Sequence, residues 1–224
     1  MSQPHPFHTT VRDLPHLLPV FPLAGALLLP GGRLPLNIFE PRYLAMVQDA
    51  LSWGRLIGMI QPLEDQVKGE EPVLYNVGCA GRISAFAETD DGRLLITLTG
   101  VCRFRTDREV DGARGYRRVT ALWEEFHRDI EGEEDNALLR LDRPRLMAAM
   151  RPYARLHNLE IDWKSLETAT DLSLATSLPM ALPLETREKQ ALLECADIAL
   201  RAHTLTALLE MAVAEKSGNP FTRQ

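Results

Sequence analysis

The residue types that catalyse reactions are present in this chain, but their spacing matches none of the common catalytic motifs. The sequence has no Gly-Lys pair of a phosphate-binding loop, no G-x-G-x-x-G, no H-E-x-x-H and no G-x-S-x-G. A nucleophilic serine also needs a neighbouring base. The four lysines are expected on loops or exposed helix faces, where they suit this role poorly: Lys68, Lys164, Lys189 and Lys216. We therefore expect no catalytic residues.

The residues that bind metals are equally scattered. Cys79, Cys102 and Cys195 lie far apart without a C-x-x-C pair, and the histidines stand in unrelated contexts. This pattern predicts no metal site, no cofactor site and no disulfide framework. Three separate cysteines are typical of a protein in a reducing compartment.

One basic cluster is present, and it has two interpretations. It consists of Arg103, Arg105, Arg108, Arg114, Arg117 and Arg118. Three acidic residues, Asp107, Glu109 and Asp111, offset half of its charge. The remaining excess could contact phosphate, which makes an RNA-binding module the alternative hypothesis. No aromatic residues interleave the arginines as a ladder, however, so the pattern favours a solvated strand face, and nucleic acid is not the expected partner.

These residues must be positioned by two parts of different composition. The chain has 224 residues, a net charge of −6, 45% hydrophobic and 25% charged residues, which is typical of a globular protein. Most glycines and prolines fall within the first 120 residues, where turns and strand ends use them. The remainder is rich in good helix formers and carries all the net negative charge. We predict a β-rich domain at 1–127, an acidic solvated linker at 128–136 and a helical domain at 137–224.

Periodicity predicts the elements of the two domains. Strands are expected at 17–21, 33–39, 55–61 and 116–126, with a hairpin over 78–109 around Asp91-Gly92 and a short helix from Pro41 to Gly54. This order indicates a mainly antiparallel, barrel-like sheet. Helices are expected at 137–158, 185–195 and 197–216. The apolar run at 17–30 is too short to cross a bilayer and lacks signal-peptide flanks, so we expect a cytoplasmic protein without membrane contact.

The segment LPVFPLAGALLLPGGRLPLNIFEPRYLAMVQDAL, residues 18–51, resembles the N-terminal substrate-binding domain of the Lon protease family. Shared pieces are an apolar FPL, a PG turn and a PL-x-IFE-x-RY segment before a helix. The resemblance continues through Asp91-Gly92-Arg93, Gly100-Val101 and Arg103-Phe104. It returns in the helical part as ALPL at 181–184 and EKQALLE at 188–194.

This resemblance implies an α+β fold: a PUA-like antiparallel β-barrel with one short helix, followed by a C-terminal helical bundle. It also implies recognition of polypeptide substrates or a partner protein, with weak homo-oligomerisation. The chain ends at Gln224 without the ATPase module or Ser-Lys peptidase domain of a full Lon protease, and so resembles the stand-alone form of the domain. A non-catalytic binding module is the leading hypothesis, and a stand-alone peptidase is the one least supported.

The candidate partner-binding residues lie where the first strands lead into the helix: Phe39, Glu40, Arg42 and Tyr43. Two interpretations stay open for them. They contact an extended segment of a partner, or Phe39 and Tyr43 belong to the core while Glu40 caps the helix and pairs with an arginine.

Overall fold

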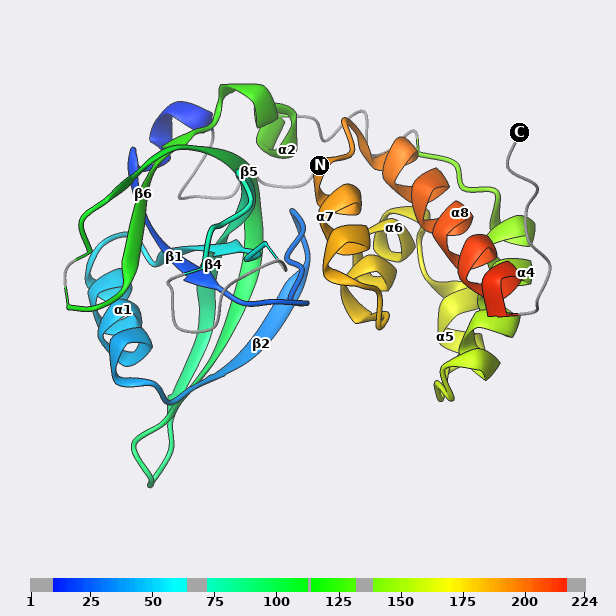
Figure 1. Ribbon diagram of the computed structural model, residues 1–224, viewed down its shortest axis with the longest axis horizontal. Helices are drawn as coiled ribbons and strands as arrows, with labels where there is room; N and C mark the ends of the chain where they lie inside the picture. Colours follow the sequence, from blue (N-terminus) through cyan, green and yellow to red (C-terminus); the bar gives the residue numbers. More distant parts are fainter. Residues whose placement is uncertain (1–9, 64–71, 113, 132–138, 217–224) are drawn as a thin grey trace. The chain divides into compact units, whose positions relative to one another are not determined.

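The computed structural model describes residues 10–63, 72–112, 114–131 and 139–216 (Figure 1). The chain divides into two compact units, Met1–Glu133 and Glu134–Gln224. The first contains the β-sheet and the second is helical. The predicted α+β class is therefore confirmed.

The sheet of the first unit has six strands. They are β1 (Leu17–Pro22), β2 (Arg33–Ile38), β3 (Leu56–Ile60), β4 (Val77–Glu88), β5 (Leu94–Val110) and β6 (Arg117–Leu122). Their order is β2-β5-β4-β3-β1-β6, and β5 also pairs with β6. The pairings from β5 through β4, β3, β1 and β6 thus return to β5, as a barrel requires. All pairs are antiparallel except β1 with β3, so the mainly antiparallel prediction is confirmed.

Strand β5 is long enough to serve both ends of this sheet. Its first residues pair with β2 and β4, whereas residues from Arg105 onward pair with β6. The predicted turn at Asp91-Gly92 connects β4 to β5, and Gly92 there has a φ of 79°. The hairpin end of β4 and β5 projects beyond the rest of the sheet (Figure 1).

The interior of the barrel is closed by large side chains that pack against glycines. A Cβ at Gly78 would lie 2.5 Å from the ring of Phe104, which is fully buried. Leu28 and Leu29, from the apolar segment between β1 and β2, are also buried. Gly100 lets Leu29 approach, because a Cβ there would lie 2.0 Å from the Leu29 carbonyl oxygen. The apolar run at 17–30 therefore forms part of this core.

Helix α1 (Pro41–Ser52) begins at the predicted proline and covers β1 and β3. Its buried face includes Tyr43, Met46 and Val47, as the periodicity predicts. The helix ends as the sequence indicates: Gly54 has a φ of 82°, and the N–H of Arg55 donates to the Ala50 carbonyl at 2.8 Å. This is the hydrogen bond of a Schellman motif.

The prediction of one short helix in the first unit is incomplete. Three further short helical segments are present: η1 (Val11–Asp13), η2 (Glu124–Phe126) and α2 (Arg128–Glu131). Helix α2 occupies the start of the predicted linker, and residues 132–136 of that linker lie outside the described residues. Asp129 in α2 is not solvated as expected, because its side chain is only 8% exposed and pairs with Arg103.

The second unit packs its helices around a main apolar core, and Leu139, Ala175 and Ala202 form a smaller apolar cluster. Its helices are α4 (Arg143–Leu156), α5 (Trp163–Thr168), α6 (Asp171–Ala181), α7 (Thr186–Glu194) and α8 (Ile198–Lys216). Met150, Leu192 and Leu209 lie in the centre of that core. Pro144 is the second residue of α4, and Pro152 lies inside the helix. Helices α5 and α6 were not predicted from the sequence, because they begin at side-chain caps by Asp162 and Thr170 and not at a strong apolar repeat.

Candidate functional site

The residues predicted to bind a partner separate into exposed and buried members. Phe39 follows β2 directly and is 62% exposed, so it is not part of the core. Tyr43 is buried, with its ring centroid 4.2 Å from that of Phe21. The contact interpretation therefore suits Phe39, and the core interpretation suits Tyr43.

Glu40 and Arg42 form a local pair above this aromatic contact. The Arg42 Nε donates to Glu40 Oε2 at 3.0 Å, and the Arg42 guanidinium lies 4.6 Å from the Tyr43 ring centroid. Glu40 stands at the N-cap position of α1, but its side chain makes no capping hydrogen bond. Burial, the largest effect, raises the pKa of Tyr43. Both charged side chains are about half exposed, which places them at the edge of any surface formed with Phe39.

The structure separates the predicted basic cluster into ion pairs. Four pairs are present: Arg103 with Asp129, Arg105 with Glu125, Arg114 with Asp49 and Arg117 with Glu109. Arg118 donates to the Asp111 carbonyl, and Arg108 is exposed. The RNA interpretation depended on an excess of positive charge. The ion pairs neutralise most of that excess. Three of the four carboxylates are distant in sequence from their arginines, so a count of nearby charged residues could not reveal these pairs.

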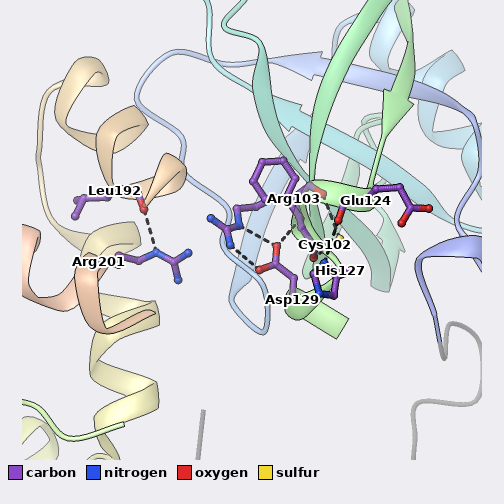
Figure 2. Close-up of polar contacts among 8 residues, drawn as sticks. Cys102, Arg103, Glu124, His127, Asp129, Leu192 and Arg201 are labelled. Atoms are coloured by element: carbon purple, nitrogen blue, oxygen red, sulfur yellow. Dashed lines mark hydrogen bonds and ion pairs between the residues drawn. The ribbon is translucent and has the colours of Figure 1, made fainter. Parts of the chain in front are cut away.

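Arg103 and Asp129 form a buried pair that fixes α2 against β5. Asp129 Oδ2 accepts from both the backbone N–H and the Nε of Arg103 at 2.9 Å, and Oδ1 accepts from Nη2 at 2.8 Å (Figure 2). The guanidinium also lies 4.7 Å from the Phe126 ring centroid. Burial opposes the charge of Arg103, but the bonds and the charge of Asp129 raise its pKa overall. The pair is a structural connection, with little surface open to a ligand.

An exposed apolar surface lies at the hairpin end of β2, β5 and β4, and sequence reasoning identified only one of its residues. Leu95 is 46% exposed and lies opposite Asn37 of β2 and Ala87 of β4. Phe86, on β4, is 52% exposed but lies opposite the buried Ile96, so its side chain is on the other face of the sheet. We call the exposed residues that share the face of Leu95, together with Phe39 directly after β2, the apolar surface: Pro35, Phe39, Ala85, Ala87 and Leu95.

A signal for this surface was present in the sequence. Along β5, Leu94, Ile96 and Leu98 supply the buried side chains, so Leu95 is an additional apolar residue in the alternate set. Exposed apolar side chains that gather in one place commonly mark binding sites. The hairpin pattern predicted the strands correctly, but it did not indicate which face of the strands is left exposed.

Among the described residues, strand β2 is an edge strand of the sheet, and it carries part of the apolar surface. Residues Arg33 to Ile38 pair with β5 on one side, and β2 is the terminal strand in the order of the sheet. An edge strand presents backbone N–H and C=O groups that can pair with another extended chain. Pro35 removes one donor from this strand, as is usual at sheet edges.

The other sequence-based expectations concern metal ligands, membrane-spanning helices and the exposure of the lysines. Within the described residues, no three His, Cys, Asp or Glu side chains gather as a metal site. Nor does that part of the chain include a helix with the length and apolarity needed to span a membrane. The expectation that every lysine is exposed is wrong for Lys189, which is buried on α7, and this burial lowers its pKa. A helix face that packs on neighbours can cover a lysine's aliphatic stem.

The proteins that this chain resembles in sequence belong to the Lon protease family. Residues 17–211 match the family model of the ATP-dependent protease La (LON) substrate-binding domain. The chain is 24% identical to a Lon protease of Cytophaga hutchinsonii over 89% of its length, and 28% identical to Lon protease 2 of Myxococcus xanthus over 88%. In both cases it spans 24% of the relative's own length, so it covers about a quarter of each.

Two solved structures resemble the fold. A Lon N-terminal domain protein from Xanthomonas campestris matches with a TM-score of 0.56 and 28% identity, covering 85% of this chain and 97% of that one. The N-terminal domain of a Mycobacterium avium complex Lon protease matches with a TM-score of 0.54 and 16% identity, covering 89% and 98%. The second likeness concerns the fold alone.

Proposed function

Because this chain belongs to the LON substrate-binding domain family, we propose that it is a non-catalytic module that binds extended polypeptides through its apolar surface. The observation that carries this proposal is the exposure of Phe39, directly after the edge strand β2, and of Leu95 on the neighbouring strand β5. The family supports substrate recognition in general. The location and the absence of catalysis are our own inference.

The geometry suggests how such binding would work. An extended segment adds to the edge of β2 by backbone hydrogen bonds, while its apolar side chains cover Phe39 or Leu95. Each large apolar side chain that becomes buried contributes roughly 1.5–3 kcal/mol before the entropy of ordering is subtracted. Backbone pairing is independent of sequence, so this arrangement suits unfolded clients of many kinds.

The other predicted residues act at the border of this surface. We assign Glu40 and Arg42 to its polar rim, since each is about half exposed and engaged with the other. Tyr43 supports the segment from beneath through its contact with Phe21. Their substitution should therefore affect binding less than substitution of Phe39.

The module acts as an adaptor that presents clients to another protein, with weak self-association. Its three cysteines are buried and lie far apart in the sequence, which is typical of a protein in a reducing compartment such as the cytoplasm. Lacking chemistry of its own, the purified chain should leave casein uncleaved with or without ATP. Cleavage by the pure chain would contradict the non-catalytic part of the proposal.

Binding is tested with an uncharged, fluorescein-labelled 15-residue peptide of Leu, Phe, Ser and Thr, followed by fluorescence anisotropy. The variant Leu95→Asp should weaken binding about tenfold, because it places a charge in the apolar contact. Leu122→Asp is the matched control, since Leu122 on β6 is also 46% exposed but lies outside the apolar surface. Equal losses in both variants, or none in either, would contradict this location.

A further inference from the structure

Helix α8 has apolar residues on two opposite sides, and one of these sides packs on α4, α6 and α7 of the second unit (Figure 1). Leu205 and Leu209 lie in the core of that unit. On the opposite side of the helix, Leu200 is 46% exposed and Met211 is 53% exposed. A helix that is apolar on all sides is usually covered on all sides, so the exposed side of α8 is a candidate interface.

The exposed side follows one line along the helix. Its residues are separated by four, three, four and three positions, so they lie on the same side: Leu200, Thr204, Ala207, Met211 and Ala214. Leu200 and Met211 are exposed, and the other three are partly exposed. This alternating spacing is that of the contact line in a coiled coil. We call these five residues the α8 face.

Charged side chains are almost absent from this part of the helix. Among Asp, Glu, Lys and Arg, residues 198–214 include only Arg201 and Glu210. Arg201 is buried, and its Nε donates to the Leu192 carbonyl at 3.0 Å. Glu210 accepts two hydrogen bonds from Arg145 of α4, at 2.8 and 2.7 Å. Both charges therefore have partners inside the second unit, and the α8 face itself is uncharged.

The exposed side of α4 differs from the α8 face in this respect. It carries Arg145, Arg151 and Arg155, which are all exposed. The same unit thus has one helix side that suits water and one that suits an apolar partner.

The order of large and small side chains makes the α8 face complementary to itself. When two copies of α8 lie antiparallel about a two-fold axis at Ala207, the two Ala207 side chains meet and let the helices approach closely. Leu200 then lies level with Ala214 of the second copy, and Met211 lies beside Thr204 of the second copy. Each large side chain meets a smaller one, as interdigitated packing requires. In a parallel pair, each residue would instead meet its own copy.

The residues that border the α8 face also suit the antiparallel arrangement. It brings Glu210 next to His203 of the second copy and Glu215 level with Ala199, so no carboxylate opposes another. The face is about 21 Å long, and a helix is about 10 Å wide. Pairing therefore buries on the order of 300 Å² per copy, below the roughly 800 Å² per partner of a stable complex, and the dimer should be weak.

We propose that the α8 face is a homodimer interface, on which α8 of a second copy of this chain packs antiparallel. A second copy is favoured over an unfolded client or a different protein, because the order of large and small side chains on the face matches its own reversed order. The dimer rests on the self-association included in the proposed function, but peptide binding at the apolar surface does not depend on it.

Sedimentation velocity at concentrations from about 10 µM to about 1 mM tests whether the dimer forms. The sedimentation coefficient of the wild type should rise with concentration. Ala207→Arg places two positive charges at the axis and should weaken the dimer at least about tenfold. Ala148→Arg is the matched control, since Ala148 is exposed on α4 and lies outside the α8 face. A wild type that stays monomeric, or dimers of equal strength in the two variants, would overturn the proposal.

Cysteine cross-linking tests the antiparallel geometry. The three native cysteines are buried, so the wild type should react little with a short bismaleimide. A mixture of Leu200→Cys and Ala214→Cys should form a cross-linked dimer, whereas either variant alone should form little. Cross-linking of each variant with itself would indicate a parallel pair, and no cross-linking in the mixture would exclude the α8 face as the interface. Either result would overturn the proposal.

Peptide binding separates this dimer from the rest of the proposed function. Ala207→Arg should bind the uncharged peptide as the wild type does, because Ala207 lies on α8 of the second unit and the apolar surface lies on the sheet of the first. A dimer that fails to form therefore leaves the peptide-binding proposal standing, and a peptide that fails to bind leaves the dimer to be judged by sedimentation.

Discussion

The β5–β6 side of the barrel and its β2–β5–β4 end use their exposed residues in opposite ways. On the first, Arg103, Arg105, Arg114 and Arg117 each meet a carboxylate. On the second, Phe39, Phe86 and Leu95 are exposed with nothing from the described chain covering more than about half of each. A charge that is already paired has little left to offer a ligand, whereas an uncovered apolar side chain gains free energy when a partner buries it.

The largest expected effect concerns the most deeply buried charge pair. Asp129→Ala should lower the free energy of unfolding by about 3–5 kcal/mol, because it leaves Arg103 charged and buried without its bidentate acceptor. Urea denaturation monitored by circular dichroism measures the change. As a control, Glu125→Ala removes an exposed pair with Arg105 and should cost about 1 kcal/mol or less. Similar losses of stability in the two variants would mean that the buried ion pair contributes no more to the free energy of unfolding than the exposed one.

The next effect should appear in binding and not in stability. Phe39→Ala should weaken the uncharged peptide about fivefold, because it removes an exposed ring from the apolar surface. Its free energy of unfolding should change by less than about 0.5 kcal/mol, since the ring is mostly in solvent. Anisotropy and urea denaturation of the same sample measure the two quantities. A large loss of stability with unchanged binding would assign Phe39 to the core.

A smaller effect is expected at Arg42, which forms an ion pair and lies three residues after Phe39 of the apolar surface. Arg42→Ala removes an exposed ion pair with Glu40 and a contact with the Tyr43 ring. Stability should fall by about 1 kcal/mol or less, and peptide affinity should change less than in Phe39→Ala. Thermal denaturation and anisotropy check this order. If Arg42→Ala has the greater effect on affinity, then charge rather than apolar contact dominates the site.

The smallest expected effect is a change in how stability depends on pH, caused by the exposed ion pair of Arg105 and Glu125. The hydrogen bond from Arg105 holds the pKa of Glu125 below its ordinary value of 4.5. The pair thus stabilises the fold above that value, and its contribution is lost as the pH falls through the lower pKa. Urea titrations between pH 6 and pH 3 should show a slightly shallower decline for Glu125→Gln than for the wild type. An identical slope would mean that this exposed pair contributes nothing.

Much of the fold could be predicted from the sequence because it follows from local patterns. Pro41 and Gly54 mark the two ends of α1, and Asp91-Gly92 marks the hairpin turn. The short helices α5 and α6 were missed because side-chain caps begin them without a strong apolar repeat. Sequence patterns indicate where an element starts and which of its faces is apolar. In the second unit they did not indicate every short helix.

The candidate site was harder to predict because it depends on contacts between distant residues. The ion pair of Arg114 with Asp49 joins residues 65 positions apart, so the cluster looked more positive in sequence than it is in space. Ala87 and Leu95 share one face of the sheet with Pro35 only through the register of three strands. Whether a side chain is covered depends on that tertiary arrangement, which is why Phe39 was identified and its neighbours were not.

Hydrogen–deuterium exchange with and without the uncharged peptide tests the central claim most directly, because it reports where backbone amides become protected. We expect protection of β2 (Arg33–Ile38) and of the hairpin ends of β4 and β5, with no change in β6 (Arg117–Leu122). Protection confined to β6 and its paired arginines, or a bound peptide that protects neither region, would contradict it.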